Sequence, residues 1–161
     1  MPPLNHAVLS ASSAYRWLEC PPSALATADI QDETTIYAQE GSAAHEMAEY
    51  KIRWHLGEKD LAPPNIGNFN AEEIDRYTDS YAYYATDKIE TIRKICPDAI
   101  VMVEQRLDFS NYVKDGFGTG DLVIVADDVL QVIDFKYGKG VTVLAEHNPQ
   151  MMLYALGALN L

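Results

Sequence analysis

Residues 120–136 read Gly-Asp-Leu-Val-Ile-Val-Ala-Asp-Asp-Val-Leu-Gln-Val-Ile-Asp-Phe-Lys. The apolar run Leu122–Val125 predicts a strand that Asp121 opens, and Val129–Lys136 predicts a second strand. The polar pair Asp127-Asp128 between them predicts a tight turn. The two strands are therefore expected to be neighbours in a meander.

Three charged side chains of this stretch are expected to converge. Side chains alternate between the two faces of a strand, so Asp134 and Lys136 point to the same side. Asp121 reaches that side as well if the strands pair. Two carboxylates and an ammonium at a sheet edge suit a hard divalent cation and an activated water.

Each of these residues also has a plainer interpretation. Asp121 fits a turn aspartate at the start of a strand. Asp134 is flanked by apolar residues, where a charge is costly unless it is paired or bound to metal. An internal salt bridge with Lys136 would satisfy that requirement, but it would not explain the nearby Asp121.

The chain before these strands, residues 10–98, is predicted to be mainly helical, with residues 23–35 irregular. Cap residues and a helical apolar period predict three helices there: Ser10 or Ser12 to Glu19, Tyr37 to His55 with Gly57 as its stop, and Asn70 to Cys96.

Residues 99–161 are predicted to run strand, strand, strand, helix. Ile100–Leu107 is the first strand, and Gly116–Gly120 is a glycine-rich turn. Asn148 and Pro149 start a last helix, Gln150–Leu161. The order predicts an α/β or α+β fold with a small mixed sheet of three or more strands flanked by helices.

The size and composition predict one domain, residues 1–161, because 48% of the residues are apolar and can bury a core. No run is long enough to span a membrane, and the N-terminus lacks the order of a signal peptide. Cys20 and Cys96 form neither a disulfide framework nor a metal motif. They predict reduced thiols in a cytoplasmic protein.

The formal net charge is −12, from 24 acidic and 12 basic side chains. This balance argues against a protein that coats nucleic acid by charge alone. It is compatible with a nuclease whose acidic metal ligands are offset by a bound cation. It also predicts weak binding to DNA without the metal.

Two further metal ligands are candidates. His45 shares a helix face with Glu49, so it is either one more ligand to a carboxylate-held cation or a core histidine whose ring Glu49 holds. Glu104 lies within the first strand, and it is either a ligand or an exposed residue on a half-buried strand.

Gln150 and Tyr154 are spaced i, i+4 and line one side of the last helix. They either orient a substrate phosphate or the attacking water, or they are packing residues with a surface amide. The glycines of Gly116–Gly120 do not fit a dinucleotide fingerprint and are expected to help place Asp121. The tyrosines of residues 77–84 fit helical core packing better than base stacking.

Taken in order, this set of residues resembles the PD-(D/E)XK nuclease superfamily, and within it the RecB-type exonuclease branch found in phages and prophages. The matching positions are His45, Glu104, Gly118-x-x-Asp121, Asp134-x-Lys136 and Gln150-x-x-x-Tyr154. The resemblance spans residues 10–161 and implies a restriction-endonuclease-like core.

The resemblance also implies roles. Asp121 and Asp134 would hold one or two Mg²⁺ or Mn²⁺ ions, with His45 an added ligand and Glu104 a weaker one. Lys136 would orient or deprotonate the attacking water. Gln150 and Tyr154 would position the nucleic-acid backbone.

The sequence departs from the family in two places. Some relatives hold an iron–sulfur cluster with one early cysteine, which Cys20 matches, and three late ones. No residue follows Leu161, so no cluster is expected in this chain. The family core has one more strand after the last helix. Its absence predicts either a truncated chain or a sheet completed by a partner chain or a homo-oligomer.

These features predict a metal-dependent DNA nuclease of the exonuclease type, acting in phage or prophage recombination, replication or DNA processing. The alternative is a catalytically incomplete nuclease-fold module that binds DNA or a protein partner. Metal-dependent cleavage distinguishes the two.

Overall fold

Five helices and three strands make up the part of the chain that the computed structural model describes, residues 7–27, 30, 35–138 and 143–161. In chain order they are α1 (Ala14–Glu19), α2 (Pro22–Ala26), α3 (Ile36–His55), α4 (Ala71–Ile95), β1 (Ile100–Asp108), β2 (Phe117–Ala126), β3 (Val129–Ile133) and α5 (Pro149–Ala158).

The strands form a meander in the order β1-β2-β3, with both pairs antiparallel. The β2–β3 pair runs from Ala126↔Val129 to Leu122↔Ile133. The predicted turn at Asp127-Asp128 is therefore confirmed. The predicted fold class, α and β elements with a small sheet flanked by helices, is also confirmed.

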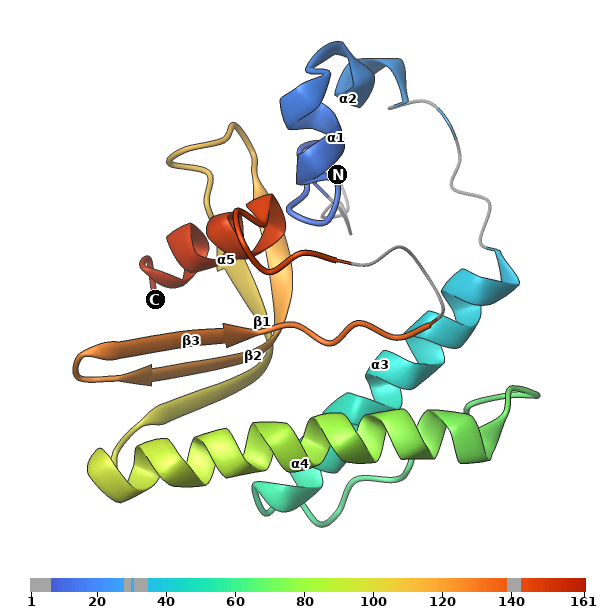
Figure 1. Cartoon of the computed structure of the whole chain (residues 1–161), viewed down its shortest axis with the longest axis vertical. Helices are drawn as coiled ribbons and strands as arrows, with labels where there is room; N and C mark the ends of the chain where they lie inside the picture. Colours follow the sequence, from blue (N-terminus) through green and yellow to red (C-terminus); the bar gives the residue numbers. More distant parts are fainter. Residues whose placement is uncertain (1–6, 28–29, 31–34, 139–142) are drawn as a thin grey trace.

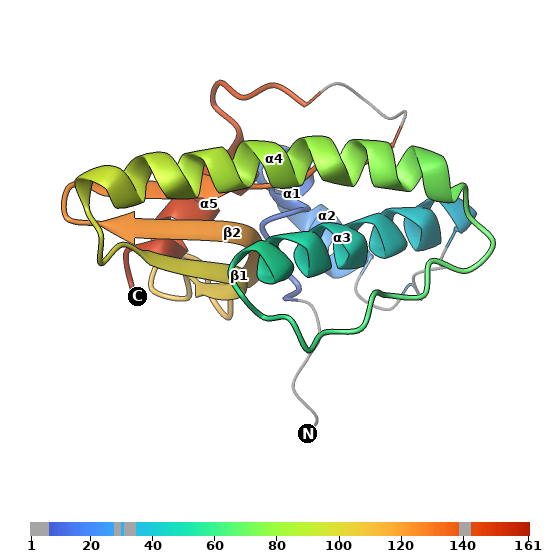
Figure 2. The same ribbon diagram turned by 90° about the horizontal axis from the view of Figure 1, so that it is seen from below.

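Helices cover both faces of the sheet (Figures 1 and 2). The long pair α3 and α4 lies against one face, and α1 and α5 lie against the other. Each face has its own core. The α3/α4 core includes Ile52, Ile74, Ala85, Leu122, Ile124 and Phe135. The α5 core includes Trp17, Leu107, Phe109, Val123, Leu153 and Tyr154.

Two helices begin at their predicted caps, Asn70 and Asn148, whereas α1 begins after Ser13, which makes no side-chain cap hydrogen bond, and not after Ser10 or Ser12. The side chains of Thr35, Asn70 and Asn148 each accept a hydrogen bond from the backbone N–H three residues on, which satisfies a donor of the first turn. Pro149 takes the first helical position. After α3, Gly57 has φ +104°, a backbone conformation that glycine adopts without strain.

The predicted glycine-rich turn is wrong, because most of that segment is strand. β2 starts at Phe117, so Asp121 lies inside the strand instead of opening it. The glycines provide room: a Cβ on Gly118 would lie 2.6 Å from Cε1 of Tyr154. Gly118 therefore allows the Tyr154 ring to lie directly against β2.

Other boundaries also differ from prediction. Part of residues 23–35 belongs to α2, whose Pro22 takes a first-turn position that needs no N–H donor. The last helix ends at Ala158 rather than Leu161. β3 ends at Ile133 rather than Lys136, because the next N–H facing β2, that of Phe135, bonds to the Asp121 side chain instead of a backbone carbonyl.

Among the described residues, no helix combines the length and the apolar character that crossing a membrane requires.

Replacing Gly157 with alanine is expected to destabilise the protein by about 1–3 kcal/mol, the usual cost of forcing a methyl group into a packed contact. Gly157 lies where α5 crosses β1, and a Cβ there would lie 2.9 Å from Cβ and 3.0 Å from the carbonyl carbon of Leu107. Gly41→Ala is the matched control: it lies in α3 with nothing within 4 Å of its Cβ, so it should stabilise by roughly 0.5–1 kcal/mol. Urea unfolding measures both, and equal effects of the two changes would contradict the packing argument.

Candidate metal centre

One left-handed residue in β1 shapes the site. Glu104 has φ +52°, a conformation that costs a non-glycine residue about 1–3 kcal/mol and occurs preferentially at functional sites. The β1–β2 ladder keeps one register on both sides of it, so Glu104 lies across from Asp121. On α3, Arg53 donates to the carbonyl of Val103, the residue just before Glu104, at 3.4 Å.

At Glu104 the strands change which of their side chains face the α3/α4 core and which face the α5 core. Val103 packs in the α3/α4 core, whereas Leu107, which regular alternation would place on the same face, packs in the α5 core. In β2, Leu122 likewise belongs to the α3/α4 core, whereas Gly118 faces Tyr154. Both strands therefore change face around Glu104 and Asp121.

This change brings Asp121 towards α3 and His45. Nδ1 of His45 lies 3.4 Å from Oδ1 of Asp121, whose side chain is only 12% exposed. One donor atom from each of His45, Glu104 and Asp121 lies within 4.8 Å of the other two. The hydrogen bond to Asp121 raises the pKa of His45 above its ordinary value, against the opposing effect of burial.

The second carboxylate oxygen of Asp121 is hydrogen-bonded to the segment that follows β3. Oδ2 accepts a hydrogen bond from the backbone N–H of Phe135 at 2.5 Å. The Phe135 ring is buried and meets the His45 ring edge-on, with centroids 5.3 Å apart. Phe135 therefore fixes both the carboxylate and the imidazole.

Asp134 and Lys136 lie on the other side of this segment and reach α5. Lys136 Nζ lies 2.6 Å from Asp134 Oδ2 and donates to Gln150 Oε1 at 3.0 Å. Nε2 of Gln150 lies 3.1 Å from both Asp134 Oδ1 and the hydroxyl oxygen of Tyr154. The four side chains thus form one hydrogen-bonded network, with Asp134 at its buried end and Lys136 half exposed.

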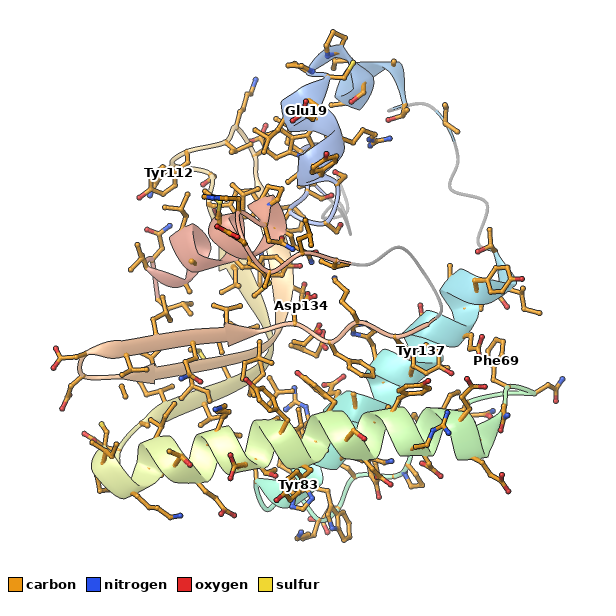
Figure 3. The ribbon with its side chains drawn as sticks, in the orientation of Figure 1. Glu19, Phe69, Tyr83, Tyr112, Asp134 and Tyr137 are labelled. Atoms are coloured by element: carbon orange, nitrogen blue, oxygen red, sulfur yellow. The ribbon has the colours of Figure 1, made fainter. Side chains whose placement is uncertain are left out.

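Figure 3 shows Asp134 where the chain leaves β3, between α5 and α3, and Tyr137 farther along the same segment near α3 and α4. Tyr137 donates a hydrogen bond to Glu40 on α3 at 3.1 Å, and its ring packs edge-on against Tyr77 on α4. This contact anchors the far end of the segment that carries Asp134 and Lys136.

The carboxyl groups of the site raise one another's pKa. Burial, and then the charges of Asp121 and Glu49, raise the pKa of Glu104 to about 7. Burial also raises the pKa of Asp134, while the hydrogen bond from Lys136 lowers it in part. Carboxyl groups that are close together and partly buried favour the binding of a divalent cation, because its positive charge offsets theirs.

The structure therefore brings all the sequence-predicted site residues to one end of the sheet, in two neighbouring groups. His45, Glu104 and Asp121 form the group with convergent donor atoms. Asp134 instead engages Lys136, as its alternative interpretation stated. The Nδ1 atom of His45 faces Asp121, and Glu49 accepts a hydrogen bond from Arg53 at 2.7 Å.

The donor set of this candidate metal centre fits a hard divalent cation. Carboxylate oxygens are the ligands of Mg²⁺ and Mn²⁺, and an imidazole nitrogen is better accepted by Mn²⁺. Near this donor set, the hydroxyl of Tyr81 on α4 is buried without a hydrogen-bond partner among the described residues, and its ring packs against Phe135.

The contributions of Phe135 and Tyr81 were missed by sequence reasoning. The backbone N–H of Phe135 carries no side-chain signal, although its place between Asp134 and Lys136 was visible. Tyr81 has the helical spacing of a core residue, and it is one, with 9% of its surface exposed. Nothing in that spacing indicates that its hydroxyl lacks a partner.

In EDTA and at pH values above 7, Glu104→Gln is expected to have a higher thermal midpoint than the wild type. Near pH 4.5 the two midpoints should be similar. The folded-state pKa of about 7 exceeds the ordinary 4.5, so the folded protein holds a proton that the unfolded chain releases. Stability from this group is therefore present below pH 4.5 and is lost as the pH rises towards 7. A neutral glutamine avoids that loss. Thermal scans across this range measure it, with the exposed Glu90→Gln as control. Parallel curves for the wild type and Glu104→Gln would contradict the raised pKa.

Comparison with known proteins places the chain in one family. No solved structure matches it. One family model matches residues 6–161, which includes every residue of the site described above. The chain therefore belongs to the family described as protein of unknown function DUF2800.

Proposed function

We propose that this protein is a metal-dependent DNA nuclease that hydrolyses phosphodiester bonds. One observation carries the proposal: His45, Glu104 and Asp121 converge as possible cation ligands beside the hydrogen-bonded set Asp134, Lys136, Gln150 and Tyr154. The resemblance to the PD-(D/E)XK superfamily predicted these same positions from the sequence.

The first group provides the cation site. A divalent cation bound there supplies Lewis-acid chemistry, which activates water and offsets negative charge on a phosphate. Asp121 is held in place by the Phe135 N–H and faces the imidazole of His45. Glu104 is held across from it by the left-handed turn of β1.

The second group provides positive charge and orientation. The Lys136 ammonium is half exposed, so a phosphate can approach it, while Asp134 and Gln150 hold it in place. An ammonium fixed next to a phosphate stabilises the charge that develops during in-line attack. Gln150 and Tyr154, already bonded to one another, are placed to orient the backbone of the nucleic acid.

The net negative charge of the protein predicts how DNA binding depends on the cation and on salt. A net charge of −12 disfavours the approach of DNA to the protein as a whole. Binding therefore depends on the cation and on Lys136. DNA binding should rise sharply when Mg²⁺ or Mn²⁺ is added and fall with salt.

The proposal is tested by incubating the purified protein with linear and circular DNA in Mg²⁺, Mn²⁺ or EDTA. Cleavage with either cation and none in EDTA supports the nuclease, and cleavage of linear DNA alone supports an exonuclease. Binding to DNA or a protein without cleavage under any metal would instead support a non-enzymatic module.

A further inference from the structure

The buried hydroxyl of Tyr81 makes no hydrogen bond to a described residue. Among the described residues, its oxygen is one of two buried side-chain polar atoms without a hydrogen-bond partner, the other being Ser23 Oγ. Leaving such a group unpaired costs about 1–3 kcal/mol, so natural cores rarely keep one without a reason. A phenylalanine would provide the same ring at that position without the cost.

The surroundings of Tyr81 connect it to the candidate metal centre. Its ring packs against Phe135, with centroids 4.7 Å apart. Phe135 in turn meets the His45 ring and donates its N–H to Asp121. Tyr81 therefore lies one ring away from His45 and Asp121, on the α4 side of the site.

The charges that act on this phenol come from the same site. Burial raises the pKa of Tyr81 above its ordinary value, and the carboxylates of Asp121, Asp134 and Glu104 raise it further. The phenol therefore stays protonated and remains a hydrogen-bond donor near three acidic groups.

We propose that Tyr81 is a positioning residue of the metal centre, whose hydroxyl donates a hydrogen bond to the oxygen atoms that surround a divalent cation held by His45, Glu104 and Asp121. This inference rests on the cation site of the proposed function, but not on nuclease activity. It explains why α4 carries a tyrosine rather than a phenylalanine at this buried position.

Tyr81→Phe should weaken cation binding without lowering the stability of the fold. In EDTA the variant is expected to melt at the same temperature as the wild type or higher, because the change removes an unpaired buried group. Its affinity for Mn²⁺ should fall by about tenfold, as is typical when a residue that supports metal ligands is lost. The rise in thermal midpoint on adding Mn²⁺ should shrink accordingly.

Tyr83→Phe is the matched control, since it removes the same atom from the same helix at a residue that is 77% exposed. It should leave both properties unchanged. Calorimetric titration with Mn²⁺ and thermal scans with and without the ion measure them.

Three outcomes would overturn the inference. They are equal Mn²⁺ affinity of Tyr81→Phe and the wild type, a lower thermal midpoint of the variant in EDTA, and a wild type that binds no Mn²⁺. A wild type that binds Mn²⁺ but does not cleave DNA would contradict only the nuclease.

Discussion

Lys136→Ala is expected to lower metal-dependent DNA cleavage by about 100- to 1,000-fold, the usual loss when a fixed group that stabilises transition-state charge is removed. The Lys136 ammonium is held by Asp134 at 2.6 Å and by Gln150 at 3.0 Å, so it is already oriented before a substrate binds. No other lysine or arginine is paired with a described residue of this network. Initial rates of cleavage under saturating Mn²⁺ measure the effect.

The same variant should still fold and bind the cation. Lys136 is half exposed and is not one of the convergent donor residues, so its loss leaves the cation site in place. Lys114→Ala, an exposed lysine in the β1–β2 connection, is the charge-matched control and should cleave like the wild type. Full activity of Lys136→Ala would remove Lys136 from the proposed mechanism. An equal loss in both variants would show that only net charge matters.

Asp121→Asn is expected to abolish cation binding and, with it, cleavage. Asp121 lies across from Glu104, faces His45 at 3.4 Å and is nearly buried, so its carboxylate is central to the convergent donor set. At a cation concentration of 100 times Kd, binding to the wild type adds about 2.7 kcal/mol. That corresponds to a rise in thermal midpoint of roughly 5–10 °C for a chain of this size. The variant should show no rise.

Asparagine keeps an oxygen that can accept the Phe135 N–H, so Asp121→Asn should remain folded in EDTA. Asp87→Asn, an exposed aspartate on α4, is the matched control and should keep the full rise. A normal Mn²⁺-dependent rise in Asp121→Asn would place the cation elsewhere. Collapse of the variant in EDTA would show that the carboxylate is needed for folding itself.

Much of the fold was predictable because its causes are local. Asn70 and Asn148 start helices by bonding to an N–H three residues away, and Asp127-Asp128 closes a turn between two apolar runs. Gln150 and Tyr154, one helical turn apart, were expected to act together, and they are hydrogen-bonded. Asp134 and Lys136 were expected on one side, and both contact Gln150.

Other features were not predictable because they depend on segments far apart in the chain. The glycines before Asp121 favour a turn on local grounds, but Gly118 makes room for Tyr154, which lies 36 positions later. β3 was predicted to be too long because no local rule says that the Asp121 side chain will take the Phe135 N–H. Both errors come from side chains that act at a distance in sequence.

The sequence by itself determined which chemical groups are present and where most helices and strands lie, since alternation and capping act within a few residues. Only the tertiary structure decided which of those groups meet. The left-handed conformation of Glu104 goes against local preference, and it occurs where Arg53 on α3 binds the preceding carbonyl. Glu104 and Asp121 meet His45 there, while α4 packs the Tyr81 ring against Phe135 and leaves its hydroxyl buried. The side chains at this site come from four separate elements, α3, β1, β2 and α4. No single stretch of sequence could therefore show that they lie together.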